Sequence, residues 1–244
     1  MKIGLQLYNF REALGQDFKG AMKEIAKIGF EGVEFACNYG GIPADELKAF
    51  MAELKLETAG AMFGPDELLD VNNGAWAYSK ALNPPTVTVG YYTDYTKEWK
   101  EVMAMLAKIG DNAAANGTVF SYHNHWWEFV DIDGEWAMER ILAGTDATKI
   151  FMEPDVCWLT RSGVAPAEFI NKYAKRICQV HIKDTTKPEE PECITELGKG
   201  VVDITGSVAA AKAIGAKWAI YEQDFSKDPF QSAADSLAVM KKLV

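Results

Sequence analysis

Residues 22–35 read MKEIAKIGFEGVEF, a stretch that joins an amphipathic helix, a glycine and a short apolar strand. Gly29 suits the left-handed residue that commonly ends a helix, and Gly32 to Phe35 then form the strand. The same order of helix, glycine and strand recurs at residues 209–222, where Gly215 comes before the strand. The stretch therefore predicts a chain in which helices and strands alternate.

Repeats of this pattern give eight strands: Lys2 to Tyr8, Gly32 to Ala36, Glu57 to Met62, Thr86 to Gly90, Val119 to Asn124, Lys149 to Asp155, Ile177 to Lys183, and Lys217 to Gln223. Eight strands with seven or eight helices predict the α/β class, as a single (β/α)8 TIM barrel in one domain over residues 1–244. A doubly wound open sheet is the alternative, but no G-x-G-x-x-G follows the first strand and the chain has no P-loop.

Composition limits the class of protein. The 244 residues match the usual size of one such barrel, and the formal net charge of -10, without a Lys/Arg cluster, argues against nucleic acid. No apolar run approaches the roughly 18 residues of a transmembrane helix, so we expect no membrane insertion. The four cysteines show no C-x-x-C spacing and the chain opens with a strand, which together predict a reduced, cytoplasmic protein.

Polar residues gather where four of the predicted strands end: Tyr122-His123-Asn124-His125, Glu153-Pro154-Asp155, His181-Ile182-Lys183-Asp184 and Glu222-Gln223-Asp224. The active sites of (β/α)8 barrels lie at the C-terminal ends of the strands. All three histidines of the chain fall at these ends. A lone histidine on a strand is more often a core residue, but three on one rim, beside two carboxylates, favour a functional site.

The same residues predict a metal site. His123 and His125 lie two apart on one strand and so project from the same face. The predicted ligands are two imidazoles and two carboxylates: His123, Asp155, His181 and Glu222. Such a set suits one divalent metal ion, Mn, Co, Zn, Fe or Mg, with open positions for a substrate.

These strand ends resemble the sugar phosphate isomerase/epimerase family, the xylose isomerase-like barrels, over essentially the whole chain. The most specific matches are Tyr122-His123-Asn124-His125 with Glu128-Phe129, Asp155-Val156-Cys157-Trp158, Val180-His181-Ile182-Lys183-Asp184, Leu197-Gly198-Lys199-Gly200 followed by Asp203, and Tyr221-Glu222-Gln223-Asp224. The resemblance implies a metal-dependent enzyme that acts on a small sugar or cyclitol.

The resemblance also leaves the reaction open. In the ketose epimerases of this family a Glu, an Asp, a His and a second Glu hold the metal, and Asp155, His181 and Glu222 match the last three. The first Glu is replaced here by His123 and His125. Members with a Tyr-His-x-His strand include dehydratases of keto-inositols and enzymes that eliminate groups from 3-keto sugars, so the resemblance implies lyase chemistry as the alternative to isomerisation or epimerisation.

Both reactions pass through an enediolate, whose charge a divalent metal stabilises. We expect His125 to be the base, since imidazole titrates near neutral pH, with Glu128 and Glu153 as alternatives. Glu222 would serve as ligand and acid, and Lys183 would orient or protonate a substrate oxygen.

Four further residues are candidates for substrate binding. Glu34 ends the second strand, where it would contact the substrate or remain a solvated charge. Trp158 would stack on a sugar face or pack as a core aromatic. Gln6 and Glu153, near the ends of the first and sixth predicted strands, complete the group.

Other functions fit the sequence less well. DNA-repair endonucleases share the barrel resemblance, but their three-metal site needs more than three histidines. The acidic loop Asp224 to Asp228 disfavours phosphorylated sugars. The non-enzymatic alternative is a sugar-binding barrel or a subunit of a larger complex, and the sequence leaves open a homo-oligomer or a partner subunit.

Overall fold

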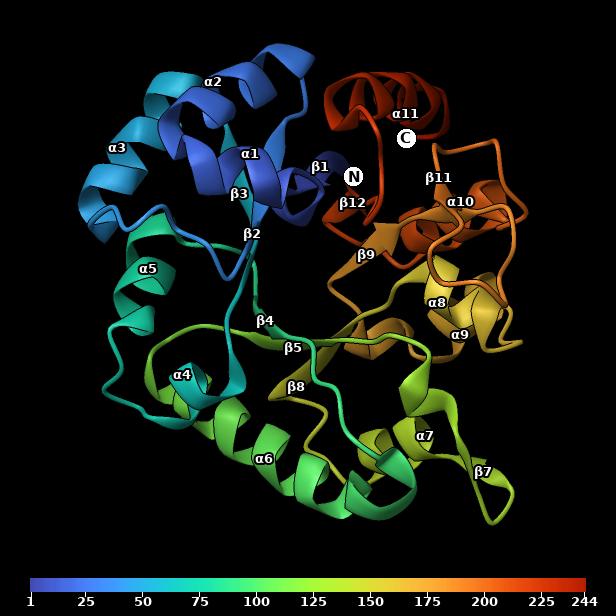
Figure 1. Ribbon diagram of the computed structural model, residues 1–244. Helices are drawn as coiled ribbons and strands as arrows, with labels where there is room; N and C mark the ends of the chain where they lie inside the picture. The colour runs from blue at the N-terminus through green and yellow to red at the C-terminus, as the bar shows by residue number, and fades with distance from the viewer.

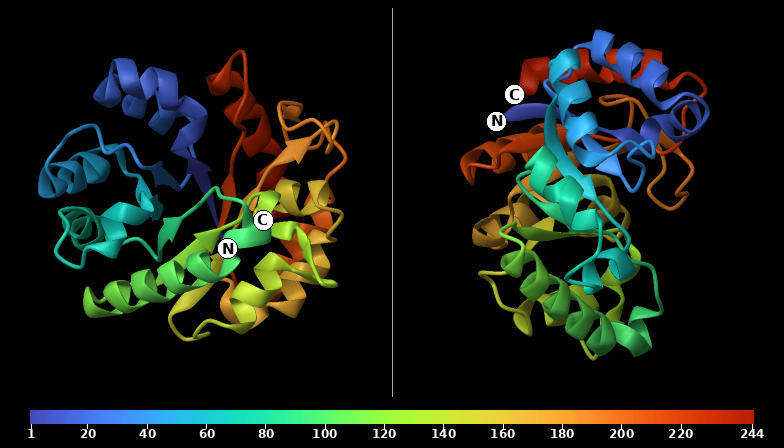
Figure 2. Two further views of the ribbon diagram at one scale, coloured as in Figure 1. Left: turned by 60° about the horizontal axis from the view of Figure 1, so that its bottom comes forward. Right: turned by 90° about the vertical axis from the view of Figure 1, so that its left-hand side faces the viewer.

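The computed structural model describes all 244 residues and contains an eight-stranded parallel sheet with the strand order β8-β5-β4-β3-β2-β1-β12-β9. Its two end strands meet through parallel bridges between Met152 and Ile177 and between Asp155 and His181, so the sheet forms a nearly closed barrel. Helices surround the strands, as Figure 1 and both views of Figure 2 show. The predicted TIM barrel is confirmed.

Every predicted strand is present. The barrel strands are β1 (Lys2–Gln6), β2 (Gly32–Ala36), β3 (Glu57–Met62), β4 (Val87–Val89), β5 (Phe120–His123), β8 (Ile150–Glu153), β9 (Gln179–Ile182) and β12 (Trp218–Tyr221). Two short antiparallel hairpins lie in the loops after β5 and β9: β6 (Asp131–Ile132) with β7 (Glu135–Trp136), and β10 (Asp184–Thr185) with β11 (Ile194–Thr195).

Several strands end earlier than the sequence predicts, because the polar residues at their ends start other structures. β1 stops at Gln6, whose side-chain oxygen accepts a hydrogen bond from the backbone N–H of Tyr8 and begins the 3-10 helix η1 (Leu7–Phe10). β8 stops at Glu153, because Asp155 caps the helix α8 (Val156–Arg161). The strand ends therefore turn at once into the rim of the barrel.

The outer layer has eleven α-helices, against the seven or eight expected. Eight of them have seven or more residues: α2 (Phe18–Ile28), α3 (Ala44–Leu54), α5 (Ala75–Leu82), α6 (Tyr95–Ala115), α7 (Ala137–Ala143), α9 (Pro166–Lys172), α10 (Ile204–Ala213) and α11 (Pro229–Leu243). The other three are the short helices α1 (Arg11–Gln16), α4 (Pro65–Leu69) and α8. Two more 3-10 turns are η2 (Trp127–Phe129) and η3 (Ala174–Arg176).

Helix α2 shows why the stretch 22–35 folds as it does. Asp17 caps the helix by accepting a hydrogen bond from the backbone N–H of Gly20, and Gly29 ends it in the left-handed conformation at φ 97°. Met22 and Ile25 are fully buried against the sheet side of the molecule. They belong to a core cluster of 62 buried residues, which joins the helices to the sheet.

The interior of the barrel is partly polar, whereas branched aliphatic residues usually fill such barrels. Thr88 and Ser121 share a hydrogen bond of 2.7 Å between their hydroxyls, and both are fully buried. Gln6 and Gln179 likewise contact buried carboxylates inside the barrel. This polar interior lies directly beneath the strand ends where the predicted site residues stand.

None of the helices combines the length and the apolar character that crossing a lipid bilayer requires.

Candidate metal centre

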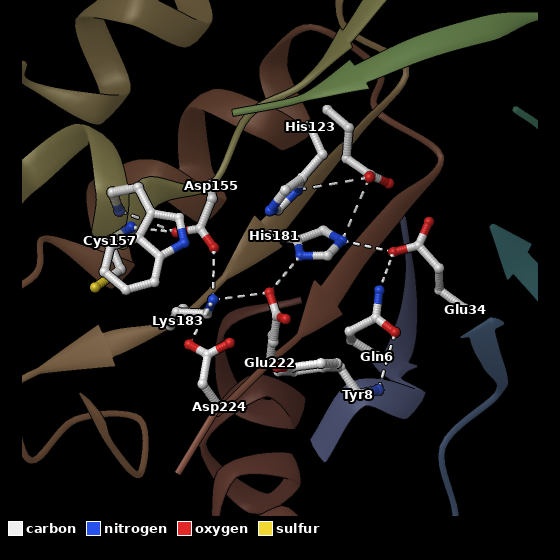
Figure 3. Close-up of polar contacts among 12 residues, drawn as sticks. Gln6, Tyr8, Glu34, His123, Asp155, Cys157, His181, Lys183, Glu222 and Asp224 are labelled. Carbon is white, nitrogen blue, oxygen red and sulfur yellow. Dashed lines mark hydrogen bonds and ion pairs between the residues drawn. The ribbon is translucent and has the colours of Figure 1, made fainter. Parts of the chain in front are cut away.

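The four predicted metal ligands meet at the C-terminal ends of β5, β8, β9 and β12. One ligand atom from each of His123, Asp155, His181 and Glu222 lies within 4.8 Å of the others. All four residues are buried, and Glu222 is the most exposed of them at 6%. Figure 3 shows the side chains of this centre converging from different strands.

Strand pairing explains this convergence. His181 on β9 pairs with Ile220 on β12, and a parallel bridge joins His181 to Asp155 just beyond the end of β8. Asp155 Oδ1 accepts hydrogen bonds from the backbone N–H groups of Cys157 at 2.8 Å and Trp158 at 3.1 Å. Capping α8 in this way fixes the carboxylate and leaves Oδ2 for the centre.

Lys183 lies in contact with three carboxylates. Its Nζ is 2.9 Å from Glu222 Oε2, 2.9 Å from Asp224 Oδ2 and 3.2 Å from Asp155 Oδ2. Burial lowers the pKa of Lys183, but Asp155, Asp224 and Glu222 together raise it well above its usual value. The side chain is therefore an ammonium, and its charge stabilises carboxylates that would otherwise repel one another.

Two more glutamates lie beneath the histidines. Glu34 Oε2 is 2.6 Å from His181 Nε2, and Glu153 Oε2 is 3.5 Å from the same nitrogen and 3.7 Å from His123 Nδ1. Both glutamates are fully buried. Burial and the neighbouring Glu153 carboxylate raise the pKa of Glu34 well above its usual value.

The residues present fit a bound divalent cation. His123 Nδ1, a buried nitrogen of the centre, makes no hydrogen bond, and Asp155 Oδ2 faces the Lys183 ammonium at 3.2 Å. Five carboxyl groups and a single lysine lie in and around the centre: Asp155, Glu222 and Asp224 contact Lys183, and Glu34 and Glu153 lie against His181. Buried carboxylates need compensating positive charge, and nitrogen and oxygen donors together suit Mn, Co, Zn or Fe.

A cleft of about 380 Å³ opens onto the centre. This volume lies near the lower end of the range of about 300–1,000 Å³ for small-molecule sites. His123 and Glu222 belong to its lining, so two of the four predicted ligands face the open space. The other lining residues are Gln6, Tyr8, Ala36, Cys37, Met62, Phe63, Gly64, Gly90, His125 and Asp224.

His125 is placed at this cleft by its neighbours. Its ring stacks on Trp127 with the ring centroids 4.3 Å apart, and its backbone N–H donates to Glu128 Oε2 at 3.0 Å. Burial lowers the pKa of His125 to about 3. The ring is therefore neutral near pH 7 and has a lone pair free to accept a proton.

The structure separates the remaining predicted residues into two groups. Gln6 lines the cleft, whereas Glu34, Glu128, Glu153 and Trp158 lie outside its lining. Glu128 is fully buried and accepts hydrogen bonds from the hydroxyl of Tyr122 and from the His125 backbone. Trp158 is 4% exposed, with the Lys183 ammonium 4.6 Å from its ring centroid.

Sequence reasoning did not assign Asp224, Tyr8 or Cys37 to the site, yet all three line the cleft. Asp224 follows Glu222 by two residues, a spacing that could have placed both carboxylates on one side of the strand end. Tyr8 is the last residue of the first predicted strand, so its strand-end position was a signal, although the structure places it in the 3-10 helix η1. Cys37 follows the second strand and carries no comparable signal.

Comparison with known proteins places these features in a family. The family model described as xylose isomerase-like TIM barrel matches residues 22–243. Inosose dehydratase from Lactiplantibacillus plantarum is 26% identical over 210 residues, which cover 74% of this chain and 68% of that protein. The chain thus spans about two thirds of the length of this relative.

Solved structures share the fold. A sugar phosphate isomerase/epimerase from Parabacteroides distasonis superposes with a TM-score of 0.83 at 21% identity, covering 99% of this chain and 98% of that one. A 3-keto-D-glucoside 4-epimerase from E. coli gives a TM-score of 0.77 at 17% identity, with 99% of each chain covered. At these identities the likeness establishes the barrel.

Proposed function

Because the chain belongs to the xylose isomerase-like TIM barrel family, we propose that it is a divalent-metal enzyme that enolises a sugar-like ketone. The observation that carries the proposal is the buried cluster of His123, Asp155, His181 and Glu222 at the base of an open cleft. The relatives and similar structures named above include inosose dehydratase and sugar epimerases, which supports a sugar or cyclitol as the substrate class.

The four ligands would hold one cation beside the bound substrate. When bound, the cation would supply Lewis-acid stabilisation of the negative charge that develops on the substrate carbonyl. His123 and His181 are neutral ligands when they bind metal, and Asp155 and Glu222 contribute two negative charges. The formal charge of the loaded set is therefore about zero, which favours the build-up of negative charge on the substrate.

His125 is the proposed base. It lines the cleft two residues from the ligand His123, and its ring is neutral, so it would accept the proton from the carbon next to the carbonyl. Burial lowers its pKa to about 3, below the near-neutral value expected from the sequence, which makes it a weaker base than an exposed imidazole. Glu128 and Glu153, the alternatives, are fully buried and lie outside the cleft lining. Their carboxyl groups are less accessible to a substrate than the imidazole.

The proposed acid groups lie on the other strands of the site. Lys183 at the end of β9 contacts both Glu222 and Asp224, which line the cleft beyond the end of β12. In an isomerase or epimerase, Glu222 would pass to carbon a proton that comes from Lys183. Burial raises the pKa of Glu222, but Lys183 and His181 together lower it well below its usual value and leave the group as a carboxylate. The cleft-lining Glu222 and the family's epimerases support this outcome.

Dehydration is the second candidate, and two observations favour it. The Lys183 ammonium is a proton donor beside the centre, unlike the paired carboxylates that serve ketose epimerases. It is buried and outside the cleft lining, but it lies 2.9 Å from the cleft-lining carboxylates of Glu222 and Asp224, which connect it to the open space. The matched curated relative is an inosose dehydratase. In this reaction His125 would take the proton from the carbon next to the carbonyl. The β-hydroxyl would then leave with a proton that comes from Lys183, and the products would be water and an alkene.

Incubation with ketoses, keto-inositols and 3-keto-glycosides in deuterated water tests the proposal. Proton NMR would show deuterium entering at the carbon next to the carbonyl, and His125→Asn would serve as the base-deficient comparison. Deuterated sugar without loss of a group identifies an isomerase or epimerase. Release of water or an aglycone identifies a lyase, and no exchange with any compound would refute enolisation.

A further inference from the structure

Glu34 lies behind a metal-ligand candidate and has no access to the cleft. Its Oε2 is 2.6 Å from His181 Nε2, while the opposite nitrogen, His181 Nδ1, is 2.9 Å from Glu222 Oε2 in the proposed metal set. The Glu34 side chain is completely buried. Figure 3 shows it on the side of the imidazole away from Asp155 and Lys183. A carboxylate in this place cannot contact a substrate in the cleft.

Neighbouring residues of the barrel hold the Glu34 carboxylate in position. Gln6 Nε2 donates a hydrogen bond of 2.8 Å to the same Oε2 atom, and Gln6 Oε1 accepts one from the Tyr8 backbone at 3.1 Å. Position 60 on the neighbouring strand β3 is a glycine, and a Cβ there would lie 1.9 Å from Glu34 Oε1. The absence of a side chain at Gly60 therefore makes the space that the carboxylate occupies.

Glu153 is less well placed for the same role. Its Oε2 is 3.5 Å from His181 Nε2, beyond the distance of a good hydrogen bond, and its Oε1 is bound by the side-chain amide of Gln179. Glu34 is the carboxylate within hydrogen-bonding distance of the His181 ring nitrogen on this side.

We propose that Glu34 is a positioning residue that holds the Nε2–H group of His181, so that Nδ1 is the nitrogen directed at the cation. This inference rests on the proposed function, because it assigns a role toward the metal in that site. Histidine ligands commonly donate their second N–H to a carboxylate, which fixes the tautomer and the ring orientation and raises the basicity of the ligating nitrogen. Gln6 and Gly60 then affect His181 by keeping the Glu34 carboxylate in place.

The test combines metal titration with histidine NMR. Zn²⁺ would be titrated into the full-length protein labelled with ¹⁵N-histidine, and the ring-nitrogen shifts would report which nitrogen carries the proton. The chain has only three histidines, so the ring signals are few enough to assign. In the wild type we expect His181 to carry its proton on Nε2 and to bind Zn²⁺ through Nδ1.

Three variants distinguish the effect of the position of the Glu34 side chain from the effect of its charge. Glu34→Ala should weaken Zn²⁺ binding by about 10–100-fold, the usual effect of losing such a partner, and should abolish the fixed tautomer. Glu34→Gln keeps an amide oxygen that can accept from Nε2–H, so it should retain the tautomer and most of the affinity. Gly60→Ala keeps the charge of Glu34 but displaces the carboxylate, and should weaken binding as well.

Thr88→Val is the matched control, since it removes a buried hydrogen bond inside the same barrel without touching the centre. Unchanged Zn²⁺ affinity and tautomer in Glu34→Ala would overturn the inference, as would an equal loss in Thr88→Val. Normal Zn²⁺ binding without deuterium exchange on any substrate would refute the proposed reaction and leave the role of Glu34 intact. A wild-type protein that binds no divalent cation would overturn both.

Discussion

The Nζ atom of Lys183 lies 2.9 Å from Oε2 of Glu222, the carboxylate oxygen that also lies 2.9 Å from His181 Nδ1. The ammonium therefore shares a proposed metal ligand with the imidazole, and it contacts Asp155 as well. A cation bound at the centre must compete with this ammonium for both carboxylates. Asp224, the third carboxylate partner, can keep Lys183 in place when the other two bind metal.

Lys183→Met should reveal this competition. Without the ammonium, the buried carboxylates lose their counter-charge, so the metal-free protein should be destabilised by about 3–5 kcal/mol. Added Mn²⁺ should then raise the melting temperature more in the variant than in the wild type. Thermal unfolding with and without Mn²⁺ measures both effects, and Lys187→Met, which removes an exposed ion pair with Glu190, is the control. An equal Mn²⁺ effect in all three proteins would show that Lys183 and the cation do not compete.

His125→Asn should separate proton transfer from metal binding. The imidazole lines the cleft but is not among the four proposed ligands, so the variant should bind Mn²⁺ as the wild type does. Loss of a positioned general base lowers rates by about 10²–10⁴-fold. Deuterium exchange into the substrate, followed by NMR, measures this step. Exchange at the wild-type rate would transfer the role of base to another residue.

Glu128→Gln should change how stability depends on pH. Burial raises the pKa of Glu128 to about 8 from the ordinary value of 4.5, so the folded protein holds a proton there that the unfolded chain releases. The contribution of this proton to the free energy of unfolding is complete below about pH 4.5. As the pH rises from there through 8, the free energy of unfolding falls by about 1.4 kcal/mol for each pH unit between the two pKa values.

Glutamine is uncharged at every pH and can still accept from the His125 backbone N–H. Urea unfolding should therefore show equal stabilities of variant and wild type at pH 5 and a more stable variant at pH 9. Parallel pH profiles for the two proteins would contradict the raised pKa.

Asp184→Asn should loosen the loop that follows β11. The carboxylate of Asp184 accepts backbone hydrogen bonds from Thr185, Gly198, Gly200 and Val202, all between 2.9 and 3.1 Å. An amide group would turn an N–H toward these donors, leaving buried groups unpaired at a cost of about 1–3 kcal/mol. Hydrogen exchange should rise selectively in residues 197–203. Exchange unchanged from the wild type would mean that other contacts fix the loop.

Much of the fold was predictable from sequence because its signal is repeated. The barrel strands are short, and helices with a clear end, as at Gly29 and Gly215, come before several of them, so the eight strands could be located. The extra helices α1, α4 and α8 were not predicted, because five or six residues are too few to show a helical period. Asp155 also looked like a strand residue until the structure showed it capping a helix.

The candidate site was predictable to the extent that strand ends identify the rim of a barrel. His123, Asp155, His181 and Glu222 come together as expected, since parallel strands bring their C-terminal ends to one side. How deeply each side chain lies along the barrel axis was not predictable. Glu34 was expected to contact the substrate or remain a solvated strand-end charge, and Glu128 was an alternative base, yet each is fully buried against a histidine of the site.

The most direct test of the account is calorimetric titration of Mn²⁺ into the wild-type protein and into Asp155→Ala, because the account depends on one cation held by four named residues. We expect one site per chain in the wild type, loss of that site in the variant, and an unchanged site in Asp111→Ala, which removes an exposed carboxylate of α6 that pairs with Lys149. Absence of Mn²⁺, Co²⁺ and Zn²⁺ binding in the wild type, or undiminished binding in Asp155→Ala, would contradict the proposed metal centre.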